Sequence, residues 1–299
     1  MTPNNSPESI KPLSVGNVVT AGIQLYRSHL KSYFLLALIG NLWAFLPFIF
    51  IVPAVSLLIF GATNGNNVVV ASLVVMAIGT VIYFYSLGKA AINTGTISRL
   101  AFQELINQPE TVSTARSQLQ PKLWVFVRLT LLMILIFLGI FIPSFILLVI
   151  PLLNLLVIIP IFAGWLWCFA RLMISYIVLA VEDTNSSRAC ISRSWDLTKE
   201  SVWRIALVLV VALLVTAPLQ IIVQFVNQTI QEGYMLPAIE AARTGSTNSI
   251  GLVAFFYLLN LALSFILSSI ISPFWQAVQA VIYYDLRNRR EGLGLNLRS

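Results

Sequence analysis

Charged residues are scarce in this chain of 299 residues. They make up 10% of it, whereas hydrophobic residues make up 58%. A water-soluble domain carries about 25% charged residues, so the composition excludes one of this length. The long apolar runs predict an all-α integral membrane protein.

Histidine and cysteine are almost absent, with one histidine and two cysteines in the whole chain. Cys168 and Cys190 have no CxxC spacing, so we predict neither a zinc site nor a disulfide framework and interpret both as small core residues. Metalloprotease, serine-hydrolase and P-loop motifs are absent too. The sequence therefore predicts a non-enzymatic protein without a metal or cofactor.

A strong basic cluster with interleaved aromatic residues is also missing, although 18 basic residues outnumber 11 acidic ones. We therefore exclude nucleic acid as a partner. In so apolar a chain, a basic excess indicates contact with anionic lipid headgroups. Membrane lipids, and other membrane protein subunits, are the expected partners.

Apolar runs of about 20 residues predict six transmembrane helices in one domain over 33–287. A cytoplasmic arm (1–32) precedes this domain, and a basic tail (288–299) follows it. The turn between the third and fourth spans falls at Pro143, Pro151 or Pro160. Pro273 is expected to end the last span before an interfacial helix over 274–287. The predicted spans are 33–60, 68–87, 123–143, 158–181, 203–226 and 250–272.

The distribution of basic residues predicts the orientation. Fifteen of the 18 lie in the arm, in the expected 88–122 and 182–204 loops, or in the C-terminal segment. The positive-inside bias then places both termini in the cytoplasm, which requires an even number of spans.

Three cytoplasmic segments carry apolar residues at helical spacing and predict amphipathic interfacial helices. Each precedes a pair of spans, which suggests a threefold repeat of interfacial helix and hairpin; chance spacing is the alternative. Tyr26, Trp195, Trp203 and Arg204 are expected to anchor these segments at the interface. The stripes are Val19, Ile23, Tyr26 and Leu30; Val112, Leu119 and Leu123; and Ile191, Trp195, Thr198 and Val202.

Three segments resemble the glycerophosphoryl diester phosphodiesterase membrane-domain family and related bacterial membrane proteins. In RLMISYIVLAVEDTNSSRACISRSWDLTKESVWRIALVLVVALL, an arginine lies in a span, acids follow at its end, and Ser-Trp-x-Leu comes before the chain re-enters the membrane. LSVGNVVTAGIQLYRSHLKSYFLLALIGNL and VIYYDLRNRREGLGLNL are similar to the terminal segments of the family. The resemblance implies a multi-span helical domain, and the residues of a catalytic domain are not in this chain.

Arg171 is the sharpest candidate for a functional residue, because it is expected near the middle of the fourth span. A charge at that depth faces the bundle interior, a lipid phosphate or water. The candidate polar or lipid-phosphate site comprises Arg171, Glu182, Asp183 and Arg193. Structural pairing of Arg171 is favoured, and pairing or helix capping is favoured for the two acids.

These observations predict a scaffold, accessory subunit or lipid-associated regulator of a membrane complex. The alternative is a small permease or lipid-translocating protein with a cytoplasm-facing cavity around Arg171. A third hypothesis is the membrane domain of a lipid-phosphodiester enzyme with a separate catalytic chain. The expected location is a bacterial cytoplasmic membrane or an internal, thylakoid-type membrane derived from it.

Overall fold

The chain is all-helical in a computed structural model that describes residues 14–64, 66–150, 153–243 and 247–291. No strand occurs among these residues. The outer parts of the predicted arm (1–13) and tail (292–299) lie outside them. The helices are α1 (Val15–Ser28), α2 (Leu30–Phe45), α3 (Phe48–Asn64), α4 (Asn66–Leu105), α5 (Val112–Leu119), the 3-10 turn η1 (Gln120–Lys122), α6 (Leu123–Val149), α7 (Leu153–Leu172), α8 (Ser175–Val181), α9 (Ser187–Thr198), α10 (Val202–Ile230), the π-helical η2 (Gln231–Met235), α11 (Leu236–Arg243) and α12 (Thr247–Glu291).

Six helical segments of the described chain are long and apolar enough to cross a membrane. They agree with the predicted count of six and with the predicted class of membrane protein. Their bounds are Leu30–Val55, Asn67–Leu105, Val112–Val149, Leu156–Val181, Val202–Ala241 and Phe255–Glu291.

The first predicted span, 33–60, is wrong as a single helix. α2 ends at Phe45 and α3 begins at Phe48, with a turn at Leu46 and Pro47 between them. Proline has no N–H to donate to the preceding turn, and its ring crowds the carbonyl four residues earlier. The break therefore follows from Pro47, whereas Pro53 is accommodated inside α3.

The predicted 88–122 loop is wrong over its first half, because α4 continues as one helix to Leu105. Sequence reading ended the span at its first charges, Lys89 and Arg99. In the structure the Arg99 guanidinium is neutralised by Glu110 at 2.7 Å, so this charge does not stop the helix. α5 and η1 occupy 112–122, and Pro121 lies in the η1 turn.

The predicted stop at Pro273 is also wrong. α12 is a single helix of 45 residues that contains Pro273, so 274–287 is not a separate interfacial helix. Its second half is buried, with Ala277, Val278 and Tyr283 all at 0% exposure. Packing against α1, α2, α4 and α10 on several sides outweighs the loss of one backbone hydrogen bond.

The fourth predicted span, 158–181, is interrupted. α7 ends at Leu172 and α8 begins at Ser175, so Arg171 occupies the last turn of a helix and not the middle of one. α6 ends at Val149 and α7 begins at Leu153, and Pro151, one of the three candidate positions for the turn, lies outside the described part of the chain. Pro143 and Pro160 are inside α6 and α7.

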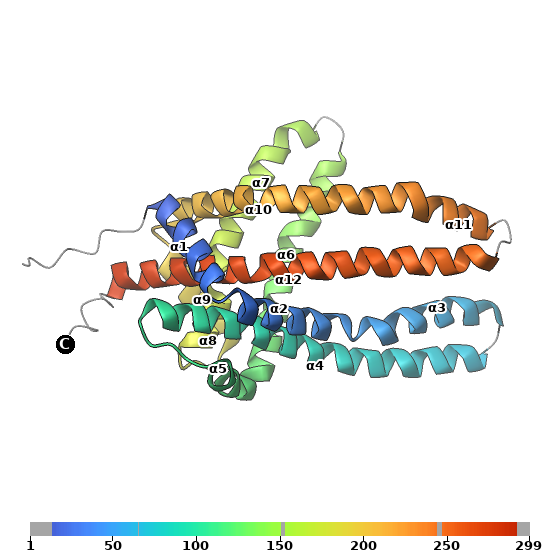
Figure 1. Cartoon of the computed structure of the whole chain (residues 1–299), viewed down its shortest axis with the longest axis horizontal. Helices are drawn as coiled ribbons and strands as arrows, with labels where there is room; N and C mark the ends of the chain where they lie inside the picture. Colours follow the sequence, from blue (N-terminus) through green and yellow to red (C-terminus); the bar gives the residue numbers. More distant parts are fainter. Residues whose placement is uncertain (1–13, 65, 151–152, 244–246, 292–299) are drawn as a thin grey trace, which may run out of the picture.

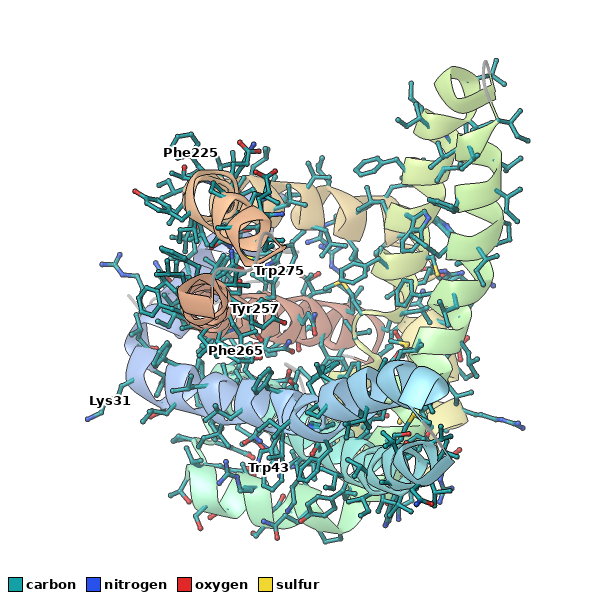
Figure 2. The ribbon with its side chains drawn as sticks, turned by 90° about the vertical axis from the view of Figure 1, so that its right-hand side faces the viewer. Lys31, Trp43, Phe225, Tyr257, Phe265 and Trp275 are labelled. Atoms are coloured by element: carbon teal, nitrogen blue, oxygen red, sulfur yellow. The ribbon has the colours of Figure 1, made fainter. Side chains whose placement is uncertain are left out.

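The short helices α1, α5, α8 and α9 gather at one end of the molecule, which we call the polar end (Figure 1). It comprises α1, α5, α8, α9 and the adjoining ends of α4 and α12. The far ends of α4, α10 and α12, together with α3 and α11, extend away from it. The α6–α7 hairpin diverges from these long helices and stands apart in the end-on view (Figure 2).

The helices α1, α5 and α9 begin in the same way. A hydroxyl at the N-cap, from Ser14, Thr111 or Ser186, accepts a hydrogen bond from the backbone N–H three residues later, at 3.2 to 3.4 Å. Such caps satisfy N–H groups that have no partner within the helix. The three helices that were predicted to be amphipathic therefore have the same kind of N-terminal cap.

The apolar face of α1 is covered by protein. Val18, Val19 and Leu25 are buried, and α1 packs against α12 and α10. An amphipathic stripe fits a bundle as well as a lipid surface, because both remove apolar area from water. Of the predicted stripe, Val19 is buried and Ile23 and Tyr26 pack on the core, whereas Leu30 is 50% exposed and begins α2, so the stripe was predicted only in part.

Candidate functional site

The candidate site is a network of ion pairs at the polar end, built around the buried helix α8. Ile177, Val178, Leu179 and Ala180 of α8 are all at 0% exposure. A helix that ends in the protein interior leaves its last backbone carbonyls without partners, and each of these carbonyls needs a hydrogen-bond donor. The cations of neighbouring helices supply these donors.

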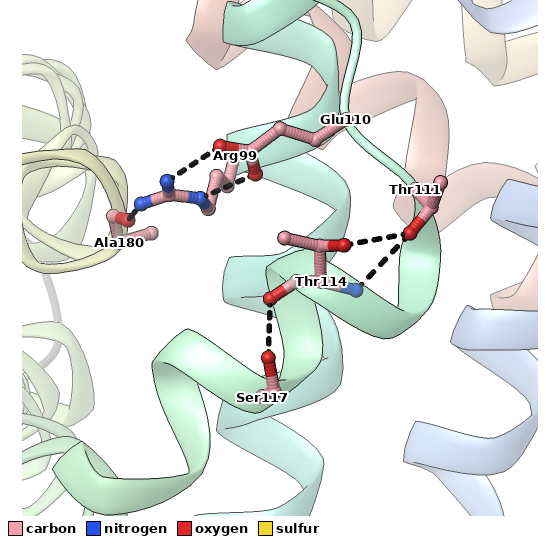
Figure 3. Close-up of polar contacts among 6 residues, drawn as sticks. All are labelled: Arg99, Glu110, Thr111, Thr114, Ser117 and Ala180. Carbon is pink, nitrogen blue, oxygen red and sulfur yellow. Dashed lines mark hydrogen bonds and ion pairs between the residues drawn. The ribbon is translucent and has the colours of Figure 1, made fainter.

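Arg99 on α4 is the first of these cations (Figure 3). Its guanidinium makes a bidentate pair with Glu110, at 2.8 Å from Nε and 2.7 Å from Nη2, while Nη1 donates to the Ala180 carbonyl at 2.8 Å. The planar guanidinium matches a carboxylate in this way, which an ammonium cannot do. Arg99 therefore joins α4, the segment before α5, and the C-terminus of α8.

Lys122 in η1 is the second cation at the end of α8. Its ammonium donates to the carbonyls of Leu179 at 3.3 Å and Glu182 at 3.0 Å. The C-terminus of a helix carries a partial negative charge, so two cations there stabilise it. α8 is thus fixed from two sides by residues that precede it by 57 to 81 positions.

Glu182, which follows α8, connects three helices. Its Oε1 accepts hydrogen bonds from the Tyr283 hydroxyl of α12 at 2.8 Å and from Arg193 Nε of α9 at 3.2 Å. Arg193 also pairs with Glu291, and Glu291 pairs in turn with Arg287 at 2.9 Å. The result is a chain of alternating charges across α8, α9 and the end of α12.

Asp285 on α12 is the centre of a second set of ion pairs. It is 6% exposed, and its Oδ2 lies 2.9 Å from both Arg204 on α10 and Arg289 on α12. Two arginine partners offset the desolvation cost of a buried carboxylate. This cluster fixes the start of α10 against α12.

Arg171 is buried at 7% exposure and reaches α9, at the polar end. Its Nη1 donates to the Trp195 carbonyl at 2.7 Å and lies 3.4 Å from the Thr198 hydroxyl. The Arg171 carbonyl accepts a hydrogen bond from the Ser194 hydroxyl at 2.7 Å. The last turns of α7 and α9 thus each supply a donor to a carbonyl of the other.

Two indole rings complete the surroundings of Arg171. The guanidinium carbon lies 4.3 Å from the ring centre of Trp195 and 5.4 Å from that of Trp167. Cation–π contacts of this kind stabilise a charge away from water. Arg171 makes no ion pair with an acid anywhere in the described ranges, so carbonyl dipoles and aromatic faces balance its charge.

The four residues of the predicted site therefore do not form one cluster. Glu182 and Arg193 are paired with each other, as sequence reasoning favoured for the acid. Arg171 has neither of them as a bonding partner. Asp183 is exposed and makes no hydrogen bond or ion pair with the described residues. The structure thus assembles part of the site and leaves Arg171 and Asp183 apart from it.

The predicted anchoring residues differ in exposure. Trp203 is 68% exposed, as an interfacial anchor requires, and Trp195 is 37% exposed with its ring against Arg171. Tyr26 is half-buried and packs on the core, and Arg204 is engaged by Asp285.

Both cysteines are free and buried, in agreement with their prediction as core residues. Burial raises the pKa of the Cys190 thiol to about 11, so it stays protonated near neutral pH. No group of histidine, cysteine and acidic side chains suited to a metal ion occurs among the described residues.

Sequence reasoning missed Arg99, Lys122, Tyr283, Asp285 and Glu291. One signal was available: Asp285 and Arg289, like Arg287 and Glu291, have the i,i+4 spacing of helical ion pairs. Lys122 had none, because its partners lie 57 and 60 positions away. Arg99 had none either, because Glu110 lies beyond the end of α4 and Ala180 is 81 positions away.

No protein-family model, curated protein or solved structure matches this chain. The resemblance to the phosphodiesterase membrane-domain family therefore stays a prediction.

Proposed function

We propose that this chain is a non-enzymatic scaffold or accessory subunit of a membrane complex. The observation that carries the proposal is the closure of the polar end. Arg171, Arg193 and Glu182 all have hydrogen-bond partners in the protein, at donor–acceptor distances from 2.7 to 3.4 Å. Charges used in this way hold helices together and leave the site with little to offer a substrate.

The proposed orientation places the polar end in the cytoplasm, with both termini on that side. Its support is the gathering of α1, α5, α8 and α9 at one end, together with most of the basic residues (Figure 1). Basic residues favour the cytoplasmic face of a membrane. We propose a bacterial cytoplasmic membrane, or an internal membrane derived from it, as the location.

The α6–α7 hairpin is the proposed docking surface for a partner subunit. It diverges from the other long helices, and Leu156, Ile159 and Phe162 on α7 are 65 to 75% exposed (Figure 2). Apolar exposure alone fits lipid as well as protein. We propose a protein partner because the diverging hairpin offers its apolar side chains to a neighbouring helix.

Copurification tests this proposal. We expect the tagged chain, extracted in a mild detergent, to carry a stoichiometric membrane protein partner. Ile159→Trp enlarges a side chain that is 75% exposed on the hairpin, and we expect it to remove the partner. Val81→Trp, at 71% exposed on α4, is the matched control and should retain it. A wild-type chain that purifies alone as a monomer would overturn the proposal.

A permease is the second candidate, because polar side chains line a groove between α10 and α12. This groove has a volume of about 400 Å³ and contains Gln220, Gln224 and Asn227 opposite Ser264 and Ser268. The Asn227 side-chain oxygen is buried without a hydrogen-bond partner among the described residues. Polar groups within spans mark transport pathways.

The permease hypothesis predicted a cavity around Arg171, and Arg171 does not line this groove. The amide side chains of the spans do not gather in one cavity. Gln220 and Gln224 face the α10–α12 groove, and Gln276 lines a separate cavity of about 430 Å³. Asn41 instead donates to Ser269 at 2.9 Å. Purification of the wild-type chain as a lone monomer would favour this candidate over the scaffold.

A further inference from the structure

A second basic site lies outside the ion-pair network, in a groove between α6 and the start of α9. The groove has a volume of about 470 Å³. Arg128 on α6 and Arg188 on α9 both line it, although they are 60 positions apart in the sequence. No acidic residue is among those that line the groove, and Asp183, the nearest acid in sequence to Arg188, is not one of them.

Arg128 and Arg188 differ from the arginines of the polar end in having no acid to pair with. Both are exposed, and neither makes an ion pair with a residue of the described chain. Arg99, Arg193 and Arg204, in contrast, each pair with a carboxylate. Two unpaired guanidinium groups that share one groove repel each other, so an anion between them relieves that repulsion.

The chain adds polar groups beside the two arginines. Ser186 and Arg188 stand at the N-terminus of α9, and Ser186 is its N-cap. The N-terminus of a helix carries a partial positive charge, which adds to the attraction for an anion. The basic part of the groove thus combines two side-chain charges with a helix end.

The other wall of the groove is apolar. Leu131, Leu132 and Leu135 line it, at three, four and seven positions after Arg128 on α6. This spacing places them on the same face of the helix as Arg128. At 1.5 Å per residue, the leucines extend about 10 Å deeper along the span than the guanidinium. A ligand of this groove therefore needs an anionic head and an apolar chain.

We propose that this groove binds an anionic phospholipid of the leaflet at the polar end. The phosphate lies between Arg128 and Arg188, and an acyl chain follows Leu131, Leu132 and Leu135. Guanidinium groups bind phosphate oxygens through charge-assisted hydrogen bonds, and a zwitterionic headgroup adds a cation that two arginines repel. The site rests on the proposed orientation in the membrane and is independent of any protein partner.

Native mass spectrometry of the detergent-purified chain tests the site. The chain is offered equal amounts of phosphatidylglycerol and phosphatidylcholine, and we expect the wild type to retain the first in preference. The double variant Arg128→Gln/Arg188→Gln should lower retention of phosphatidylglycerol by about tenfold, since charge-assisted bonds are lost. Arg128→Lys/Arg188→Lys, which keeps both charges, should retain part of it.

The matched control removes the same charge elsewhere. Arg27→Gln/Lys31→Gln changes two exposed basic residues at the polar end, neither of which lines this groove, and Lys31 points away from the bundle (Figure 2). We expect this variant to retain phosphatidylglycerol as the wild type does. Equal losses in the two double variants would show diffuse attraction and would overturn the site, as would unchanged retention in Arg128→Gln/Arg188→Gln.

A second arm separates the lipid from its soluble headgroup. Glycerol 3-phosphate carries the phosphate without acyl chains, so we expect no displacement of phosphatidylglycerol at equal concentration. Displacement by glycerol 3-phosphate would identify a site for a soluble phosphate ester and would overturn the lipid assignment. Loss of a protein partner in copurification leaves both arms unaffected, so the two proposals fail separately.

Discussion

The polar end and the far halves of the long helices are held together by different forces. At the polar end, ion pairs and carbonyl caps join α4, α8, α9 and α12, and five of the seven residues of α8 are buried. In the apolar windows of the six spans, between 6% and 33% of residues are buried. Ring contacts such as Phe45 with Phe265, at 5.2 Å, link α2 to α12 there (Figure 2).

The polar end therefore determines the fold more strongly than the far halves of the long helices do. The polar end has directional contacts whose removal leaves buried groups unpaired, so it depends little on its surroundings. The far halves expose apolar side chains, and lipid tails are as apolar as those side chains. Substitutions in the two regions should therefore have unequal effects on stability in detergent.

Removal of the Arg99 side chain is expected to have the largest effect. Arg99→Met leaves the Glu110 carboxylate and the Ala180 carbonyl without their donor, and the Arg99 side chain is only 12% exposed. Loss of one partner of a buried pair costs about 3 kcal/mol. We expect a large fall in the thermal midpoint in detergent. Arg27→Met, at an exposed position on α1, should change it little; equal effects would contradict a closed polar end.

A glycine in each region provides a second comparison. A Cβ at Gly22 on α1 would lie 2.7 Å from Val278 Cγ2, and Val278 is fully buried on α12. Overpacking of this kind costs about 2 kcal/mol, so Gly22→Ala should lower the midpoint. A Cβ at Gly139 on the α6–α7 hairpin meets nothing within 4 Å. Gly139→Ala should leave the midpoint unchanged or raise it, and a fall as large as that of Gly22→Ala would refute the contrast.

The sequence predicted the class, the number of candidate spans and the helices α1, α5 and α9, because these follow from runs of apolar residues and their period. Helix ends were predicted less well. Lys89 and Pro273 were taken as stops, and both lie inside continuous helices. A charge or a proline ends a helix only when tertiary contacts do not compensate for it, and those contacts come from other segments.

The candidate site was predicted only in part. Glu182 and Arg193 are 11 positions apart, and pairing or helix capping was favoured for Glu182, whereas the pair of Arg99 and Glu110, at the same separation, was missed. Tyr283 joins them from 101 positions away, and Arg99 reaches Ala180 across 81. Arg171 was recognised as unusual, yet its partners depend on the turn at 173–174, which apolar periodicity does not reveal.

Substitution of Arg171 is expected to have the smallest effect on the unfolding midpoint, and it tests which contacts stabilise a charge at the polar end. Arg171→Lys keeps the charge and loses the planar group that faces Trp195 and Trp167. The lost cation–π contacts are worth about 1 kcal/mol. A double-mutant cycle with Trp195→Leu measures this coupling from unfolding midpoints, because the cycle cancels the separate effects of each change. We expect a clear coupling energy, and a value of zero would mean that the Trp195 carbonyl alone holds the guanidinium.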